Sequence, residues 1–198
     1  MEELKRLLSI LDADSSVESI ESTFSKIADI LLFKSYIKTE INNYRILEIE
    51  FYFKNKNHED NVTLARTVKE GMWWLHDWGV DLSFRSEENS FYGGILIRSI
   101  IPFIKNSNKI DDKAIFDPRK CCWYMFDSSA LDHNMAPQIV MNDEARRHDG
   151  EIGTTSRYLT SKPKKEDGDY RDCLYRFYVN GLDLRIEPNY KKASPWKK

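Results

Sequence analysis

The stretch "RILEIEFYFKNKNHED", residues 45–60, decides the fold because its first half alternates between apolar and polar side chains. An alternation with a period of two predicts a strand that turns one face toward a core. On such a strand Glu50 and Tyr52 project from the same face, roughly 7 Å apart. Glu50 is then either a polar residue facing water, the favoured interpretation from spacing alone, or an acid that works beside an aromatic ring. The two faces of the strand are Leu47, Ile49, Phe51 and Phe53 on one side and Ile46, Glu48, Glu50 and Tyr52 on the other.

Composition places the chain among ordinary globular proteins. Its 198 residues are 41% hydrophobic and 31% charged, which fits one domain with a substantial core. The net charge of −2 argues against a protein that coats nucleic acid non-specifically, because such binding needs many Lys and Arg contacts to phosphate. A local basic groove is still compatible with that charge.

The chain carries no signal for a membrane or for an oxidising compartment. It has no run of 18 apolar residues, so we expect no membrane span and no membrane partner. Its first residues, "MEELKRLLSILDADSS", lack the basic-then-apolar pattern of a signal peptide. The three cysteines, Cys121, Cys122 and Cys173, form no C-x-x-C pair, and we interpret them as reduced thiols. We therefore expect a cytoplasmic protein.

Apolar spacing and turn residues predict the remaining elements. Two N-terminal helices are expected at residues 2–12 and 17–32, and a short helix at 61–71 that Gly71 closes. The Asn180-Gly181 pair predicts a final hairpin between "LYRFYV" and "LDLRI". Strands are expected within 41–53, 72–79, 80–86 and 91–103, with an irregular and functional excursion over 105–170.

The last of these strands is central, and it carries one charge, Arg98, inside an apolar run. A buried guanidinium must be paired, because a lone buried charge is too costly. The partner is either a structural carboxylate or a catalytic one. The two interpretations coincide if the partner is Glu50.

Three tryptophans stand close together in "MWWLHDWG", residues 72–79. Trp73 and Trp78 are five residues apart and so face opposite sides of a regular strand. We therefore expect one of them to be exposed beside Gly79, where a stacking or wedge residue could act.

A metal site is the less favoured interpretation of the histidines. None of the four shows the fixed ligand spacing of a metal motif, and 32 acidic residues place an acid near each of them almost by chance. We therefore expect no metal, and a metal-dependent hydrolase is the third functional alternative. Its candidate ligands are His58, Asp60, His76, Asp77, Asp81, Asp132 and His133.

Four separated segments resemble, in the same order, the alkyladenine (3-methyladenine) DNA glycosylase family. "ADILLFKSYIKTEINNYRILEIEFYF" is similar to its leucine-rich helix end and I-V-E-T-E-A-Y strand, and "MWWLHDWGVDLSF" to its Y-V-Y-x-x-Y-G-M segment. "GGILIRSIIP" is similar to A-V-L-L-R-A-x-E-P, and "GEIGTTSRYL…LYRFYVNG" to R-I-G-I-(x)-S followed by R-F-Y-V-x-G. The resemblance covers residues 28–181.

The resemblance implies a single α+β domain with a curved, largely antiparallel sheet around a pocket. We expect residues 1–32 to form N-terminal helices, 33–188 the core and 189–198 a basic tail. Peripheral helices complete this expected fold.

The resemblance also implies roles for individual residues. Glu50 falls on the family's catalytic acid, which activates a water for attack on the sugar of a flipped nucleotide, and Arg98 on an arginine that holds this water. Tyr52 and His58 fall on residues that stack on the extruded base, and Trp78 on the aromatic wedge that fills the gap in the duplex. No lysine is placed for a Schiff base, so the implied reaction is simple hydrolysis without a cofactor.

The departures from the family leave two functions open. The third pocket aromatic falls near Leu75, and Trp74 replaces it if the alignment slips by one. The family's T-P-R-N segment is reduced to "TLARTVKEG", and its N-G-P-G-K-L segment is missing. The first function is hydrolysis of the N-glycosidic bond of a damaged or modified purine in duplex or single-stranded DNA. The second is a non-catalytic module that keeps the pocket for a nucleobase or another flat ligand.

Overall fold

Two helices open the chain, as their apolar spacing predicts. α1 spans Glu2–Ile10 and α2 spans Val17–Asp29, and a π-helical turn at Ile30–Lys34 continues α2. Ser16 caps α2 by accepting a hydrogen bond from the Ser19 amide at 3.3 Å. No helix within the described ranges combines the length and apolar character needed to cross a bilayer. This computed structural model describes residues 1–87, 89–103, 113–126, 136–141, 150–159, 162, 164–182 and 194–196.

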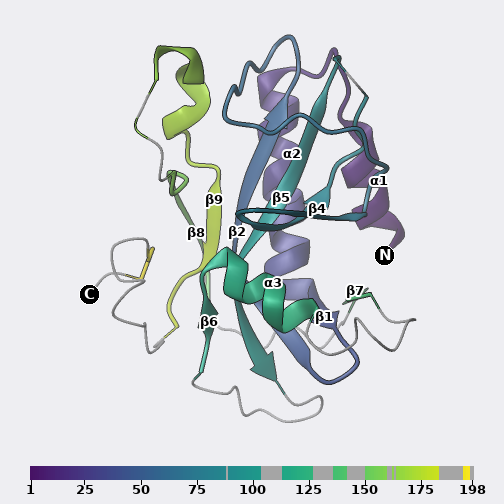
Figure 1. The fold of residues 1–198 in the computed structure, drawn as a ribbon, viewed down its shortest axis with the longest axis vertical. Helices are drawn as coiled ribbons and strands as arrows, with labels where there is room; N and C mark the ends of the chain where they lie inside the picture. The colour runs from purple at the N-terminus through teal and green to yellow at the C-terminus, as the bar shows by residue number, and fades with distance from the viewer. Residues whose placement is uncertain are drawn as a thin grey trace.

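The strands form one curled antiparallel sheet with the shape of a half-barrel (Figure 1), which confirms the expected α+β fold. Its main path has the order β3-β4-β5-β2-β1-β7, while β6 pairs with β5, β9 with β2, and β8 with β9. The strands are β1 Ser35–Lys38, β2 Asn43–Lys54, β3 Trp73–His76, β4 Gly79–Ser83, β5 Tyr92–Phe103, β6 Ile115–Phe116, β7 Gln138–Met141, β8 Ile152–Thr155 and β9 Arg176–Val179.

A β-bulge in the long β2–β5 pair reverses which side chains face the main core. The register runs from Ile46 opposite Ile100 to Glu48 opposite Ser99, which leaves Leu47 as the extra residue. Ile46 therefore belongs to the main core together with Ile49, whereas Leu47 packs in a smaller cluster. The faces expected for Ile46 and Leu47 are therefore wrong, because one inserted residue turns the side chains before it to the opposite face of the strand.

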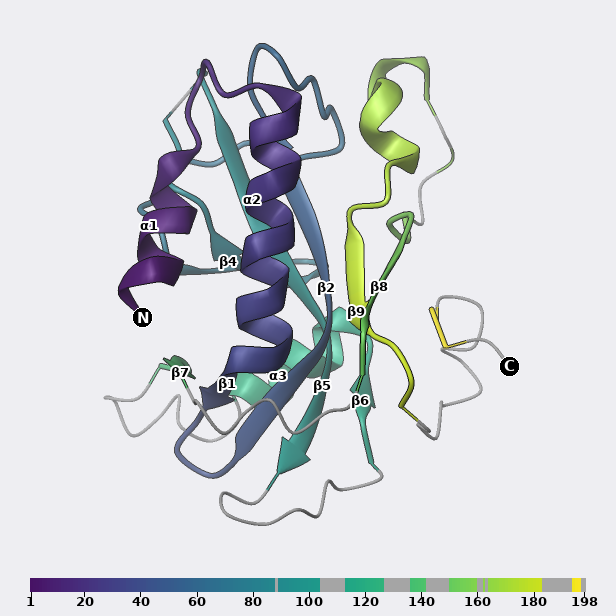
Figure 2. The same ribbon diagram turned by 180° about the vertical axis from the view of Figure 1, so that it is seen from behind.

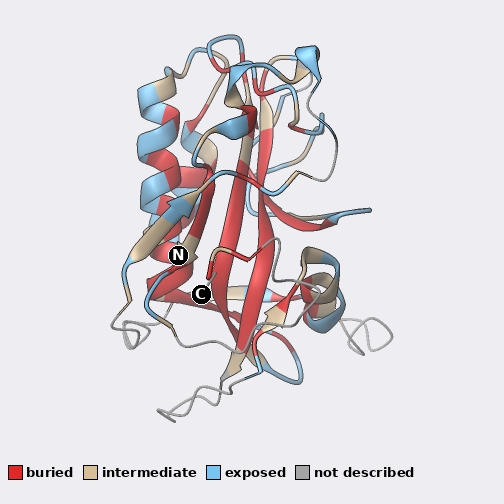
Figure 3. Cartoon of the chain, turned by 90° about the vertical axis from the view of Figure 1, so that its left-hand side faces the viewer, coloured by how far each residue is buried: buried red, intermediate tan, exposed pale blue. Residues whose placement is uncertain are grey.

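Helix α2 covers one face of the central strands, as Figure 2 shows. Phe24 of α2 stacks on Phe51 of β2, with ring centroids 4.4 Å apart, and meets Tyr175 edge-on at 5.2 Å. Burial of each such aromatic ring contributes about 1.5–3 kcal/mol of hydrophobic stabilisation. The buried residues run along the central strands and the inward side of the helix (Figure 3). This packing holds β2 and β5 in place for the groups on their other face.

The other face of β2 and β5 carries polar and charged side chains that are also buried. Helix α3, Pro118–Phe126, lies over one end of this face (Figure 1). The chain after β8 lies over another part of it, where the Tyr158 amide bonds to Glu50 at 2.7 Å. The candidate site is built on this polar face.

Residues 61–71 do not form the expected helix, but turns and irregular chain. Their backbone groups bond to another part of the chain: the Gly71 amide donates to the Ser83 carbonyl at 2.9 Å, and the Ser86 amide to the Val68 carbonyl at 3.1 Å. Because these groups are satisfied across the fold, the segment gains nothing from a helical ladder. It forms a wall beside β4 instead.

Regular elements also occur within the span expected to be irregular, since "CCWYMF" belongs to α3 and β6, β7 and β8 lie in the same span. Strand β9 confirms part of "LYRFYV", but its described partners are β2 and β8. Most of "LDLRI" lies outside the described residues, so the final hairpin stays a prediction. The expected basic tail, 189–198, is described only at 194–196, where Trp196 is buried and its Nε1 donates to the Val179 carbonyl at 2.7 Å.

Candidate functional site

Two buried carboxylates, Glu48 and Glu50, stand side by side on the polar face of β2, each with 0% exposure. Arg98 of β5 binds both: its Nε is 3.2 Å from Glu48 Oε1 and its Nη1 is 3.1 Å from Glu50 Oε2. Arg176 of β9 also bonds to Glu48, and its Nε lies 3.8 Å from Glu50 Oε1. The two negative and two positive charges balance, which is the condition for burying them.

Glu50 has a hydrogen-bond donor on each oxygen. Its Oε2 accepts from the Tyr52 hydroxyl at 2.8 Å as well as from Arg98, and its Oε1 accepts from the Tyr158 amide at 2.7 Å. The buried charge of Arg98 requires a partner, and Glu50 is one of two, because a second carboxylate, Glu48, shares that arginine. The favoured expectation that Glu50 faces water is wrong, because the side chain is buried. Its bonds suit a structural acid as well as a positioned one.

Burial raises the pKa of Tyr52 well above its usual range, and the negative charge of Glu50 raises it further. The phenol therefore keeps its proton and acts as a donor to Glu50. Because Tyr52 also contacts the neighbouring cavity, it connects the buried acid to a surface that a ligand can reach.

A cavity of about 690 Å³ lies above this network, within the size range of small-molecule sites. Tyr52, Leu96 and Arg98 contribute from the two central strands. The walls come from the loop after β2, the β3–β4 hairpin, the start of α3 and the chain after β8. The remaining lining residues are Val62, Leu64, Arg66, His76, Trp78, Asp81, Asp117, Pro118, Arg119, Tyr158, Leu159, Lys164 and Asp167.

One wall of the cavity is held by a second buried ion pair, Arg66 with Asp81, at 2.5 Å. His76 joins it, with Nε2 3.1 Å from the other Asp81 oxygen. The Nδ1 of His76 accepts from the Trp78 amide at 3.2 Å, so in the neutral ring the proton is on Nε2 and is donated to Asp81. This bonding fixes the hairpin turn that carries Trp78.

A third ion pair, between Arg157 and Asp60, holds the wall that contains Tyr158. Arg157 bonds to both Asp60 oxygens, at 2.6 and 2.9 Å, and to the carbonyls of Phe51 and Tyr170. Although burial alone would lower the pKa of Arg157, the bonds and charge of Asp60 raise it, so the guanidinium stays charged. The guanidinium also lies 4.7 Å from the Tyr52 ring centroid. The pair therefore positions the cavity wall.

His58 does not line the cavity but is buried beside it, with 0% exposure. Its Nδ1 lies 2.8 Å from the Phe53 carbonyl and its Nε2 lies 2.9 Å from the Tyr175 hydroxyl, while the Tyr170 ring packs against it at 3.8 Å. Because a carbonyl only accepts, Nδ1 carries the proton of the neutral ring. Burial lowers the pKa of His58, which keeps the ring neutral. In this position His58 cannot stack on a ligand in the cavity.

The aromatic residues of the β3–β4 hairpin separate into two groups. Trp78 lies at the turn, lines the cavity and is 53% exposed, as expected of one tryptophan beside Gly79. The Trp74 ring instead packs against the Arg66 guanidinium, whose Cζ lies 3.9 Å from the ring centroid. Leu75 is 54% exposed. Neither Trp74 nor Leu75 lines the cavity. Of the residues to which the resemblance gives roles, Tyr52, Trp78 and Arg98 do, and Glu50 lies directly beneath.

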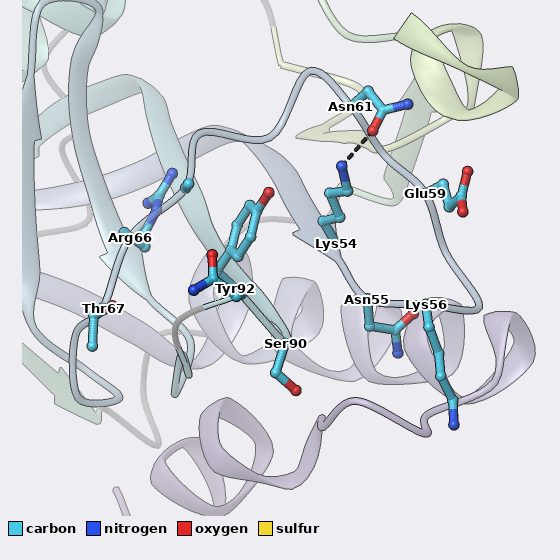
Figure 4. A pocket seen from close by; sticks show the side chains of 11 residues that line it. Lys54, Asn55, Lys56, Glu59, Asn61, Arg66, Thr67, Ser90 and Tyr92 are labelled. Carbon is cyan, nitrogen blue, oxygen red and sulfur yellow. Dashed lines mark hydrogen bonds between the residues drawn. The ribbon is translucent and has the colours of Figure 1, made fainter. Parts of the chain in front are cut away.

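A second cavity, of about 580 Å³, lies further along β2 and β5 (Figure 4). Lys54, Tyr92 and Arg66 line it, and Arg66 lines the first cavity as well. Lys54 donates to the Asn61 side chain at 2.5 Å, as the dashed line in Figure 4 marks. Its lining is mostly polar and lies away from the Glu50 network, so the first cavity is the candidate site.

Metal-ligand side chains do not gather in the part of the chain that the structure describes: no three His, Cys, Asp or Glu residues there could hold an ion together. His58 bonds to Phe53 and Tyr175, whereas His76 and Asp81 bond to each other in the cavity wall. Asp132 and His133 lie outside the described residues.

The cavity residue that sequence reasoning missed is Tyr158, whose ring lies 5.7 Å from the Arg98 guanidinium. It is 108 residues from Glu50, and an isolated aromatic carries no local signal of such a contact. Arg66 and Arg119 were also missed, because no local signal in the sequence places them at the cavity, whereas His76 and Asp81 were considered only as metal ligands.

Comparison of the chain with protein-family models found no matching family, and comparison with curated proteins found no matching relative.

Proposed function

We propose that the cavity binds a nucleotide unit, a nucleobase joined to a sugar and a phosphate. One observation carries this proposal: three aromatic residues and several basic residues line a single cavity of about 690 Å³. Tyr52, Tyr158 and Trp78 offer ring surface, and flat bases stack on such rings. Arg119 and Lys164 offer positive charge, which phosphate oxygens accept in charge-assisted hydrogen bonds.

Binding is favoured over catalysis because the oxygens of Glu50 are occupied. The Tyr52 hydroxyl and Arg98 take one oxygen and the Tyr158 amide takes the other. A general base must reach the proton that it abstracts, directly or through one water. In this arrangement a water reaches Glu50 only after the Tyr52 hydroxyl moves aside.

Hydrolysis of an N-glycosidic bond is the second candidate, supported by the ion pair of Glu50 and Arg98 at 3.1 Å beneath the cavity. In this reaction a water takes the place of the Tyr52 hydroxyl at Glu50 and gives its proton to the carboxylate. The water oxygen bonds to C1′ of the sugar as the bond from C1′ to the base breaks. The base leaves with the bonding electrons and takes up a proton, and the carboxylate stabilises the oxocarbenium-like transition state. A modified purine in DNA is the proposed substrate.

Calorimetric titration with three ligands tests the binding proposal. AMP carries both base and phosphate, whereas adenosine lacks the phosphate and ribose 5-phosphate lacks the base. We expect AMP to bind most tightly, and Tyr158→Ala to weaken AMP by about 5- to 150-fold, the range for loss of one stacking ring. Leu174→Ala is the control, because Leu174 is 58% exposed and does not line the cavity. If none of the three ligands binds, the cavity is not a nucleotide site.

Base-release assays test the second candidate, with duplex and single-stranded oligonucleotides that carry hypoxanthine, ethenoadenine or 3-methyladenine. Glu50→Gln is expected to reduce release by about 10²- to 10⁴-fold, the usual contribution of a general base. Glu48→Gln is the matched control, since Glu48 is equally buried and shares Arg98 but has no bond to Tyr52. Equal loss in both variants would show that the network is structural, and release by neither variant nor the native protein would exclude hydrolysis of these substrates.

A further inference from the structure

Trp78 combines high exposure with a fixed position. It is 53% exposed at the β3–β4 turn, although a large apolar ring is usually buried. Its amide donates to His76 Nδ1 at 3.2 Å, and its ring forms part of the cavity lining. A ring that is exposed and still contacts the cavity is positioned to meet whatever extends from a bound ligand.

The start of helix α3 packs against the turn that carries Trp78 and forms a hydrogen bond with it. Gly79 packs so closely on Pro118 that a Cβ at Gly79 would lie 2.8 Å from the Pro118 Cβ. Gly79 also has a φ of +144°, which other residues rarely adopt. Arg119 donates from Nε to the Asp77 carbonyl at 2.6 Å. The turn is therefore preorganised, and a ligand that stacks on Trp78 loses little affinity to ordering it.

Arg119 places a positive charge beside the same ring. Its guanidinium lies 5.3 Å from the Trp78 ring centroid, and it lines the cavity as well. Its side-chain partner among the described residues is the Asp77 carbonyl, which is neutral. No carboxylate in the described part of the chain forms an ion pair with this guanidinium, although Asp117, whose Oδ1 accepts from the Arg119 amide at 2.9 Å, lines the same cavity. A phosphate could accept from the remaining N–H groups of the guanidinium.

A second exposed ring follows on α3. Trp123 is four residues after Arg119, so the two side chains are neighbours on the same face of the helix. Trp123 is 70% exposed. Trp78, Arg119 and Trp123 thus form a strip, called here the aromatic strip, that begins in the cavity lining and continues onto α3.

We propose that the aromatic strip binds the nucleotides that follow the one in the cavity, so that the ligand is a single-stranded oligonucleotide. This inference rests on the proposed nucleotide binding and names its ligand class. Rings and a cation in alternation suit a single strand, in which bases are unpaired and phosphates are regularly spaced. The strip continues directly from the cavity through Trp78 and Arg119, which belong to both.

Titration of the full chain with AMP and with fluorescein-labelled dA5 separates the strip from the cavity. We expect dA5 to bind more tightly than AMP, and Trp123→Ala, whose ring does not line the cavity, to weaken dA5 by about 5- to 150-fold, the range for loss of one stacked base, while AMP affinity stays unchanged. The variant Met72→Ala is the control, because Met72 is 55% exposed near the β3–β4 hairpin but lines neither cavity. Arg119→Gln should make the slope of log affinity against log salt for dA5 shallower by about 0.7, the value for one phosphate contact.

The outcomes distinguish the strip from the cavity. If AMP binds but dA5 gains nothing, or if Trp123→Ala leaves dA5 binding unchanged, the strip proposal is wrong while the cavity proposal stands. A preference for the same sequence in duplex form would also overturn it, because paired bases cannot stack singly on the strip. If neither AMP nor dA5 binds, both proposals fail. Circular dichroism confirms that each variant is folded before it is scored.

Discussion

The Tyr52 hydroxyl donates to Glu50 at 2.8 Å, so that a side chain of the cavity wall is bonded to the acid beneath it. The two residues are neighbours on one face of β2, and their contact is the physical link between the buried charges and the cavity. Whatever the cavity binds, this hydrogen bond decides whether Glu50 is shielded or reachable.

Removal of that hydroxyl should destabilise the fold. Tyr52→Phe leaves a buried carboxylate oxygen with one donor fewer, and we expect the free energy of unfolding to fall by about 1–3 kcal/mol. Urea denaturation followed by circular dichroism measures the change. Tyr92→Phe is the comparison, on the next strand in the lining of the second cavity, and should differ little from the native protein. Equal stability of both variants would mean that a solvent molecule replaces the hydroxyl at no cost.

Loss of the shared arginine should be more severe. Arg98→Met leaves Glu48 and Glu50 with Arg176 as the remaining guanidinium of the network, and breaking a buried ion pair in this way costs about 3–5 kcal/mol. Arg85→Met, at an exposed site, should change stability by less than about 0.5 kcal/mol. Thermal and urea unfolding of the two variants provide the comparison. A small effect of Arg98→Met would indicate that the carboxylates take up protons or water when their partner is removed.

His58 should make stability depend on pH. Burial lowers the pKa of His58 in the folded chain below the ordinary value of 6.5. As pH falls through 6.5, His58 therefore takes up a proton in the unfolded chain but not yet in the folded chain. The stabilisation is therefore fully present above pH 6.5 and is lost as pH falls toward the lowered pKa of the folded state. Between pH 7.5 and 5.5 the loss from this one group is at most about 1.4 kcal/mol.

The difference between two proteins isolates that contribution. Urea unfolding of the native chain and of His58→Gln at both pH values removes the effects of other titrating groups, which the two proteins share. We expect a smaller decline in His58→Gln. A parallel decline in both would show that another group controls the acid sensitivity.

Gly94 should tolerate no side chain, for a reason that concerns the cavity wall. A Cβ at this position of β5 would lie 2.4 Å from Arg66 Nη1 and 2.9 Å from the Asp81 Cβ. Gly94→Ala must therefore displace the ion pair that crosses the strand, and overpacking of this kind costs about 1–3 kcal/mol. Both the unfolding midpoint and AMP affinity should fall. An unchanged midpoint would mean that Arg66 and Asp81 shift without loss of their contact.

Much of the secondary structure was determined by the sequence alone. The period of the apolar residues predicted α1, α2, β2 and β5, because burial of one face imposes that period on any stable element. The apolar run around Arg98 also required a buried partner for its charge, and Glu50 is one of its two partners. These predictions depend only on residues that are close together in the sequence.

Other features depended on contacts between distant residues. The bulge at Leu47 turns the side chains before it to the opposite face of β2, yet nothing local in the sequence marks it. Residues 61–71 have a sequence typical of a short helix, but their backbone forms hydrogen bonds with Ser83 and Ser86 instead. Only the folded sheet brings these residues close to the segment. Local propensity is weak compared with these tertiary terms.

The site shows the same division. From the sequence came the spacing of Glu50 and Tyr52 and the exposed position of Trp78. Only the tertiary structure brought Tyr158 to Glu50 across 108 residues and buried His58 outside the cavity lining. The physical reason is that local periodicity shows which face of an element is buried, whereas a cavity is formed by several elements whose packing involves the whole chain.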